Sequence, residues 1–151
     1  MPGASPRFIH LRTHTEHSLL EGAVPVKKLV HHAVDKKGNV TLGLVNAMRM
    51  PAVAVTDTNN MFAALEFSVA AMATGVQPIL GCQISIAHDP AQPGERPRLP
   101  APIVLLAQDE QGYMNLMRLN TRLYIDGAMT GSANLPQVTL DELAQNAEGL
   151  I

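Results

Sequence analysis

The sequence has few of the residues that several common functions require. Its single cysteine, Cys82, excludes an internal disulfide and a cysteine-based zinc cluster, and suits a reducing cytosol. It has no tryptophan and only 3% aromatic residues, which argues against a base-stacking surface for nucleic acid. No apolar run approaches the roughly 18 residues of a membrane-spanning helix, and the first residues lack a signal-peptide core. These absences predict a cytoplasmic protein that contacts no membrane.

Charge is scarce as well. Charged residues make up 16% of the chain, and 11 basic against 13 acidic side chains give a net charge of −2. A chain of this charge lacks the long-range attraction that nucleic-acid-binding modules exert on DNA. Hydrophobic residues account for 46% of the 151 positions, which is typical of a globular domain. Composition therefore predicts a folded domain that does not itself bind DNA.

Short apolar runs alternate with helical patterns along the chain. We expect strands at 8–11, 52–55, 78–86 and 103–107, and helices at 24–36, 61–74, 110–123 and 140–147. The stretch 41–50 is ambiguous and favours a helix capped by Asn39 or Thr41, whereas the proline-rich stretch 88–102 predicts an exposed loop. The alternation predicts an α/β fold with mostly parallel strands and functional loops at their carboxyl ends.

The loop after the first expected strand concentrates chemically useful side chains. Between residues 10 and 22 it holds His10, Arg12, His14, Glu16, His17 and Glu21, residue types that suit a metal site or acid–base chemistry. If the segment is extended, His10 and His14 stand about 13 Å apart, too far to share one ion. A histidine pair with one residue between would need position 12, where the guanidinium of Arg12 cannot bind a metal. A polar loop held by hydrogen bonds explains the segment equally well.

Other candidate residues point more to structure than to chemistry. Asp57 follows a strand, where a cap or turn former is more common than a metal ligand. Gln83 is a neutral amide and a poor ligand for a divalent cation. We expect Cys82 to be a small buried apolar residue. We expect His31, His32 and His88 to lie on the surface. The familiar nucleotide-binding and hydrolase motifs are absent from the sequence.

Ordered blocks of sequence nevertheless resemble a known family. The blocks are residues 8–22, 51–57, 75–82, 105–108 with 112–117, and 148–151. Together they resemble the PHP (polymerase and histidinol phosphatase) domain, and specifically the PHP domain at the N-terminus of the bacterial DNA polymerase III alpha-subunit family.

The resemblance implies a fold and a domain layout. It implies the N-terminal part of a distorted (β/α)7 barrel covering residues 7–151, behind a disordered tail at 1–6. The apolar run after Gly149 leads us to expect a chain truncated at its C-terminus. Residues 34–49 look like an insertion relative to the family. The polymerase palm, fingers and clamp-binding parts would lie outside this chain.

The resemblance also assigns a metal pocket whose ligands are mostly replaced. The two histidines of the family's first ligand pair fall on Arg12 and His14, and the acidic ligand falls on Glu21. The later histidine and glutamate ligands fall on Thr58 and Gln83, and Asp57 adjoins the same pocket. These six positions are therefore expected to be vestigial, with no metal, or at most one held by His14 and Glu21. We also expect Arg12 to replace the lost cations by pairing with Glu21 or Asp57.

Three functions follow as hypotheses. The leading one is a degenerate PHP domain that acts as a structural platform and docks a proofreading exonuclease subunit among other replicase subunits. Its parent would be a DNA-directed DNA polymerase, a nucleotidyltransferase that uses Mg²⁺ and holds DNA through other domains; the fragment itself would need no cofactor and be inactive. The alternative is a metal-dependent phosphoesterase or exonuclease using His10, His14, Glu16, Glu21 and Asp57. The third is a free-standing binding domain.

Overall fold

A computed structural model describes residues 8–30, 33–34, 40–41, 43–87, 99–125 and 135–151. Contacts divide the chain into two compact units. The first comprises Met1–Asp57 and Phe62–Leu80, and the second comprises Thr58–Met61 and Gly81–Ile151. The expected tail at 1–6, the histidines His31, His32 and His88, and most of the expected proline loop lie outside the described residues.

The first unit combines short helices with a parallel strand pair. Strand β3 (Ala52–Val55) pairs in parallel with the start of β4 (Gln77–Ile86), from Ala52 beside Gln77 to Val55 beside Leu80. Helix α3 (Ala64–Ala73) connects the two strands, so the expected strand–helix–strand unit is confirmed. All residues of β3 are buried, as its continuous apolar run predicts.

The expected strand at 8–11 is replaced by an extended segment beside β3. The backbone carbonyl of His10 accepts a hydrogen bond from the Ala54 N–H (2.8 Å), and that of Thr13 accepts one from the Thr56 N–H (2.9 Å). The segment has no strand assignment in the structure. The prediction of a strand was therefore wrong. The predicted position of the polar loop was right, because these two hydrogen bonds hold it at the end of β3.

The expected helix at 24–36 ends early. Helix α1 covers only Val26–Val30, and Ala33–Val34 instead forms strand β1, which pairs antiparallel with β2 (Val40–Thr41). The β-branched side chains of Val34, Val40 and Thr41 favour strand pairing, which here overrides the helical spacing. The residues expected to close the helix, 36–39, lie outside the described residues.

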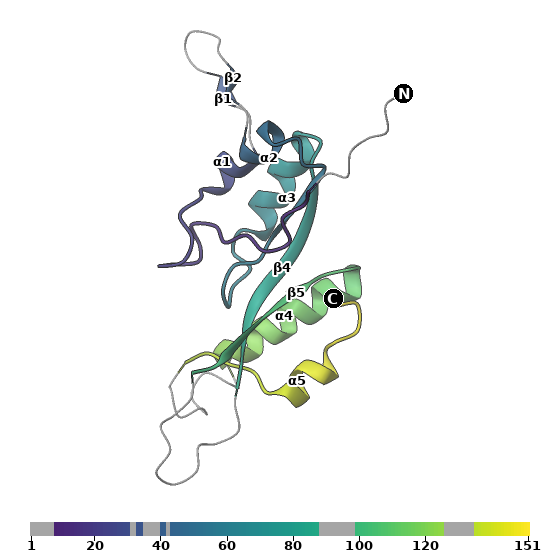
Figure 1. Ribbon diagram of the computed structural model, residues 1–151. Helices are drawn as coiled ribbons and strands as arrows, with labels where there is room; N and C mark the ends of the chain where they lie inside the picture. The colour runs from purple at the N-terminus through teal and green to yellow at the C-terminus, as the bar shows by residue number, and fades with distance from the viewer. Residues whose placement is uncertain (1–7, 31–32, 35–39, 42, 88–98, 126–134) are drawn as a thin grey trace. The chain divides into compact units, whose positions relative to one another are not determined.

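The expected second helix is also shorter than predicted. Helix α2 covers Leu44–Ala47 and begins after Gly43, so neither Asn39 nor Thr41 caps it. The hairpin β1–β2 and helix α2 together occupy the stretch that resembles an insertion. Figure 1 shows α1, α2 and α3 gathered within the first unit. Their apolar side chains enclose a core that includes Val26, Val45, Val53 and Phe67.

The second unit is built on an antiparallel strand pair. The later part of β4 pairs with β5 (Ala101–Leu106), from Gly81 beside Leu106 to Ile86 beside Ala101. The prediction of mostly parallel strands fails here, because β4 and β5 run antiparallel to each other. The expected loop at 88–102 also ends sooner, since Pro102 already lies in β5.

Two helices complete the second unit. Helix α4 (Glu110–Ile125) confirms the helix expected at 110–123, and Figure 1 shows it alongside β5. Helix α5 (Leu140–Gln145) begins at a capping box between Thr139 and Glu142. The last residues run antiparallel to the end of β5, where Leu106 and Ile151 exchange two backbone hydrogen bonds (2.8 and 3.0 Å). The core of this unit includes Ile84, Leu116, Leu119 and Leu123.

None of the helices in the described part of the chain has the length and apolarity that crossing a bilayer requires.

Tyr124 ties α4 to the loop at 58–61 within the second unit. Its hydroxyl donates a hydrogen bond to the carbonyl oxygen of Asn59 (2.9 Å). Although 53% of the Tyr124 surface is exposed, burial of the rest raises the pKa of its phenol, and the nearby Cys82 thiol raises that pKa further. The phenol therefore stays protonated to higher pH in the folded chain than in the unfolded one.

This shift can be measured by an absorbance titration. The chain has two tyrosines, so a Tyr113→Phe variant leaves Tyr124 as the only phenol. We expect its ionisation midpoint above the ordinary tyrosine value of 10.0. Folding stability should fall as pH rises past that value, because the unfolded state loses the proton first. A midpoint at or below the ordinary value in the folded variant would contradict the packing described for Tyr124.

Candidate functional site

Asp57 lies at the centre of the polar loop structure of the first unit. It lies two residues after the end of β3 and is 1% exposed. Its Oδ1 accepts hydrogen bonds from the Thr15 N–H and the Ser18 hydroxyl, both at 2.6 Å, and its Oδ2 accepts one from the Thr15 hydroxyl at 2.7 Å. Both carboxylate oxygens are therefore engaged by a loop about 40 residues earlier in the chain.

The loop at 15–22 is folded tightly around these bonds. The Ser18 N–H donates to the Thr15 carbonyl (3.0 Å), and the Gly22 N–H donates to the Ser18 carbonyl (2.9 Å). A side chain on Gly22 would bring its Cβ to 2.0 Å from the Thr15 carbonyl oxygen, so only glycine fits there. Leu20 has a left-handed backbone (φ 70°), and both Leu19 and Leu20 are exposed at the tip. Internal hydrogen bonds thus hold the loop, while the apolar side chains at its tip are exposed to solvent.

The side chains of His14 and Glu21 lie within hydrogen-bonding distance of each other at one side of this loop. His14 Nδ1 and Glu21 Oε2 lie 3.1 Å apart, and Glu21 is the more exposed of the two. The other ring nitrogen, His14 Nε2, is buried and has no hydrogen-bond partner within the described residues. The expected pairing of Arg12 with Glu21 or Asp57 is not found, because the ion pairs of the described residues include none of Arg12.

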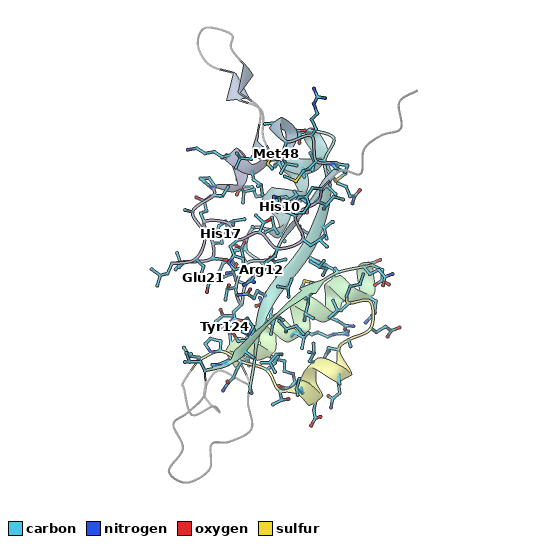
Figure 2. All side chains as sticks on the ribbon, in the orientation of Figure 1. His10, Arg12, His17, Glu21, Met48 and Tyr124 are labelled. Atoms are coloured by element: carbon cyan, nitrogen blue, oxygen red, sulfur yellow. The ribbon has the colours of Figure 1, made fainter. Side chains whose placement is uncertain are left out.

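The same side chains line a cavity of about 570 Å³ in the first unit. Its polar lining consists of His10, Arg12, Thr13, His14 and Glu21. Its apolar walls come from α1, α2 and β3 and the residues next to them, and include Leu29, Leu44, Val45, Met48, Met50 and Val53. Figure 2 shows Met48 beside α2, and His10 and Arg12 on the segment that leads to Glu21.

Thr58 and Gln83 lie in the second unit and bond to each other. Gln83 Nε2 donates to Thr58 Oγ1 (3.1 Å), and the Asn59 N–H donates to the Gln83 carbonyl (2.8 Å). Gln83 is buried, and its Oε1 has no hydrogen-bond partner in the part of the chain that the structure describes. A neutral amide paired with a neutral hydroxyl needs no cation to hold it together.

Several residues that organise these loops escaped the sequence analysis. Thr15 and Ser18 supply the donors to Asp57, and Asn59 exchanges two hydrogen bonds with Ser85, each of 3.0 Å. Asn59 has a left-handed backbone (φ 53°), which asparagine tolerates better than most residues. The signal was present in the sequence as small hydroxyl and amide residues beside strand ends, but such residues are common in any turn.

The remaining candidates stand apart from this network. Cys82 is buried and its thiol contacts the Asn60 carbonyl oxygen at 3.4 Å, which confirms it as a small core residue. His17 makes an edge-on ring contact with Phe62, and His10 one with Phe8. Glu16 is exposed.

The donor set does not fit the metal cluster that the family resemblance implies. Within the described residues, no three histidine, cysteine or acidic side chains come together in a way that could hold an ion. In the first unit both Asp57 oxygens accept hydrogen bonds, Glu21 is paired with His14, and the Arg12 guanidinium stands where a ligand would be needed. A divalent cation would have to displace these bonds and lie beside a positive charge.

Comparisons with known proteins agree with the resemblance. The model of the PHP domain family matches residues 10–151. A DNA polymerase III subunit alpha from Caulobacter vibrioides is 38% identical over 146 residues, which cover 95% of this chain and 11% of that protein. One from Pseudomonas fluorescens is 39% identical over 145 residues, with the same coverage. This chain thus spans about a tenth of the length of these relatives.

Among solved structures, an amidohydrolase from Chromobacterium violaceum matches with a TM-score of 0.46 and 19% identity, over 91% of this chain and 48% of that one.

Asp57 is expected to carry much of the stability of the first unit. In an Asp57→Asn variant an amide NH₂ replaces one acceptor and faces donors, which should lower the free energy of unfolding by about 1–3 kcal/mol. Urea denaturation measures the change. Glu16→Gln is the matched control, because it removes an exposed carboxylate of the same loop and should leave stability within about 0.5 kcal/mol. Equal stability of the two variants would show that the Asp57 hydrogen bonds contribute nothing.

Proposed function

The chain belongs to the PHP domain family, and from that premise we propose that it is a degenerate PHP domain serving as a structural platform in a bacterial replicative DNA polymerase. The observation that carries the proposal is the 38–39% identity to DNA polymerase III alpha subunits across 95% of the chain. In that setting DNA synthesis, with its Mg²⁺ ions, belongs to parts of the polymerase outside this chain. The net charge of −2 supports the same division, with DNA held elsewhere.

Loss of phosphoesterase chemistry forms the second part of the proposal. The family ligand positions at Arg12, Thr58 and Gln83 carry side chains that do not bind a divalent cation well. His14 and Glu21 retain ligand-type side chains but bond to each other. We propose that these positions and Asp57 form a vestigial pocket that stabilises the fold without performing hydrolysis.

Docking of a proofreading exonuclease subunit, beside other replicase subunits in the cytoplasm, is the third part. It is supported by an apolar stripe that begins at Phe62, just before α3, and continues along that helix at Leu65, Val69 and Met72; we call these four residues the α3 stripe. These side chains recur at helical spacing and are each 63–79% exposed. Contiguous exposed apolar surface of this kind often marks a site of protein interaction.

The metal content of the purified chain distinguishes the proposed structural role from the alternative phosphoesterase function. After dialysis against Mn²⁺ or Zn²⁺ and removal of free ions, we expect far less than one metal ion per chain by elemental analysis, because the polar donors are already bonded. Hydrolysis of a phosphodiester by the same sample should not exceed that of a buffer blank. Stoichiometric metal together with metal-dependent hydrolysis would revive the phosphoesterase and overturn this part of the proposal.

Direct binding tests the platform itself. The chain, immobilised on a sensor, should bind the purified proofreading exonuclease subunit of the same organism. A Leu65→Glu, Met72→Glu variant should weaken binding at least tenfold, because charges would replace apolar contacts in the α3 stripe. A variant with Met114→Glu and Leu140→Glu, both exposed apolar residues of the second unit, is the control.

Absence of binding by the unsubstituted chain would contradict the docking role. Equal binding by the two double variants would instead reject the α3 stripe as the docking surface and leave docking to another face.

A further inference from the structure

The cavity of the first unit is lined by two chemically different sets of side chains, one polar and one apolar. Its volume, about 570 Å³, lies within the range of about 300–1,000 Å³ typical of small-molecule sites. Such sites combine mostly apolar walls with a few polar groups that fix the orientation of a ligand. The cavity has this composition, and all its described lining residues belong to a single compact unit.

Part of the apolar lining is already packed. Leu29, Val45 and Val53 belong to the buried core and also line the cavity. Leu44, the first residue of α2, and Met48, which follows that helix, line it as well and are 51% and 59% exposed. An apolar group lying between these two sets would remove surface from water on both, which favours binding by roughly 25 cal/mol for each Å².

The polar lining includes one permanent cation, Arg12. It has no ion-pair partner in the described part of the chain. A guanidinium presents several N–H donors in a planar fork that matches a carboxylate. Among the described residues that line the cavity Glu21 is the only acidic one, and its carboxylate lies 3.1 Å from His14 Nδ1. His14, whose Nε2 is buried without a partner among the described residues, also lines the cavity.

We propose that this cavity binds a monocarboxylate with an aliphatic chain. The carboxylate would pair with Arg12, and the chain would lie along the wall formed by Leu29, Leu44 and Met48. A monoanion fits better than a phosphate dianion because the negatively charged Glu21 lines the same cavity. The proposal does not depend on the polymerase context, since every residue in it belongs to the first unit.

Isothermal titration of the chain with octanoate tests the proposal. We expect saturable binding of one octanoate, with affinity rising about three- to fourfold for each methylene from butanoate to octanoate. Octylamine and octan-1-ol, which keep the chain but lose the negative charge, should bind at least tenfold more weakly. Octyl phosphate should bind more weakly than octanoate because of Glu21.

Matched variants locate the site. Arg12→Gln should weaken octanoate binding about tenfold, whereas Lys28→Gln, which removes an exposed positive charge from α1 outside the cavity, should not. Met48→Gln should weaken it about threefold, whereas Met72→Gln on α3 should not. Glu21→Gln should tighten binding, because it removes the one acidic side chain among the described residues that line the cavity.

Each other outcome overturns the proposal. Equal binding of octylamine and octanoate would reduce the site to a non-specific apolar surface. Weaker octanoate binding by the Glu21→Gln variant would show that the octanoate carboxylate does not pair with Arg12. Tighter binding of octyl phosphate would reassign the site to phosphate esters, and no heat of binding would exclude an organic anion.

Discussion

The buried carboxylate of Asp57 is the interaction on which the first unit depends. It accepts hydrogen bonds from Thr15 and Ser18 and so joins the end of β3 to a loop far away in the sequence. A carboxylate buried to this extent is costly unless donors surround it, and here the loop supplies them. The same hydrogen bonds hold the backbone between His14 and Glu21, and both of these residues line the cavity of the first unit.

The polar side chains of the proposed vestigial pocket bond mainly to protein partners. Asp57 accepts hydrogen bonds from Thr15 and Ser18, the Glu21 carboxylate lies 3.1 Å from His14 Nδ1, and Gln83 donates to Thr58. Two buried atoms, His14 Nε2 and Gln83 Oε1, have no hydrogen-bond partner in the described part of the chain. Under the proposed function these contacts hold the pocket as part of the scaffold, and Arg12 lines the cavity of the first unit.

Sequence reasoning predicted the elements with strong local signals and failed where distant contacts decide. The buried runs of β3 and β5 and the helical spacing of α4 were sufficient to place them. The end of α1 at Val30 was missed because pairing between β1 and β2 outweighs helical spacing. The same limit applies to the site: Asp57 was identified, but its partners lie about 40 residues away and only the fold brings them together.

The central claim is that Asp57 acts as an internal hydrogen-bond acceptor rather than a metal ligand. Hydrogen exchange of the Thr15 amide, followed by NMR with and without Mn²⁺, tests it most directly. We expect the Thr15 amide to exchange only on unfolding of the first unit, far more slowly than that of Leu19 at the exposed loop tip, and to show no change on adding Mn²⁺. A Thr15 amide that exchanges as fast as that of Leu19, or one whose signal is broadened by stoichiometric Mn²⁺, would contradict it.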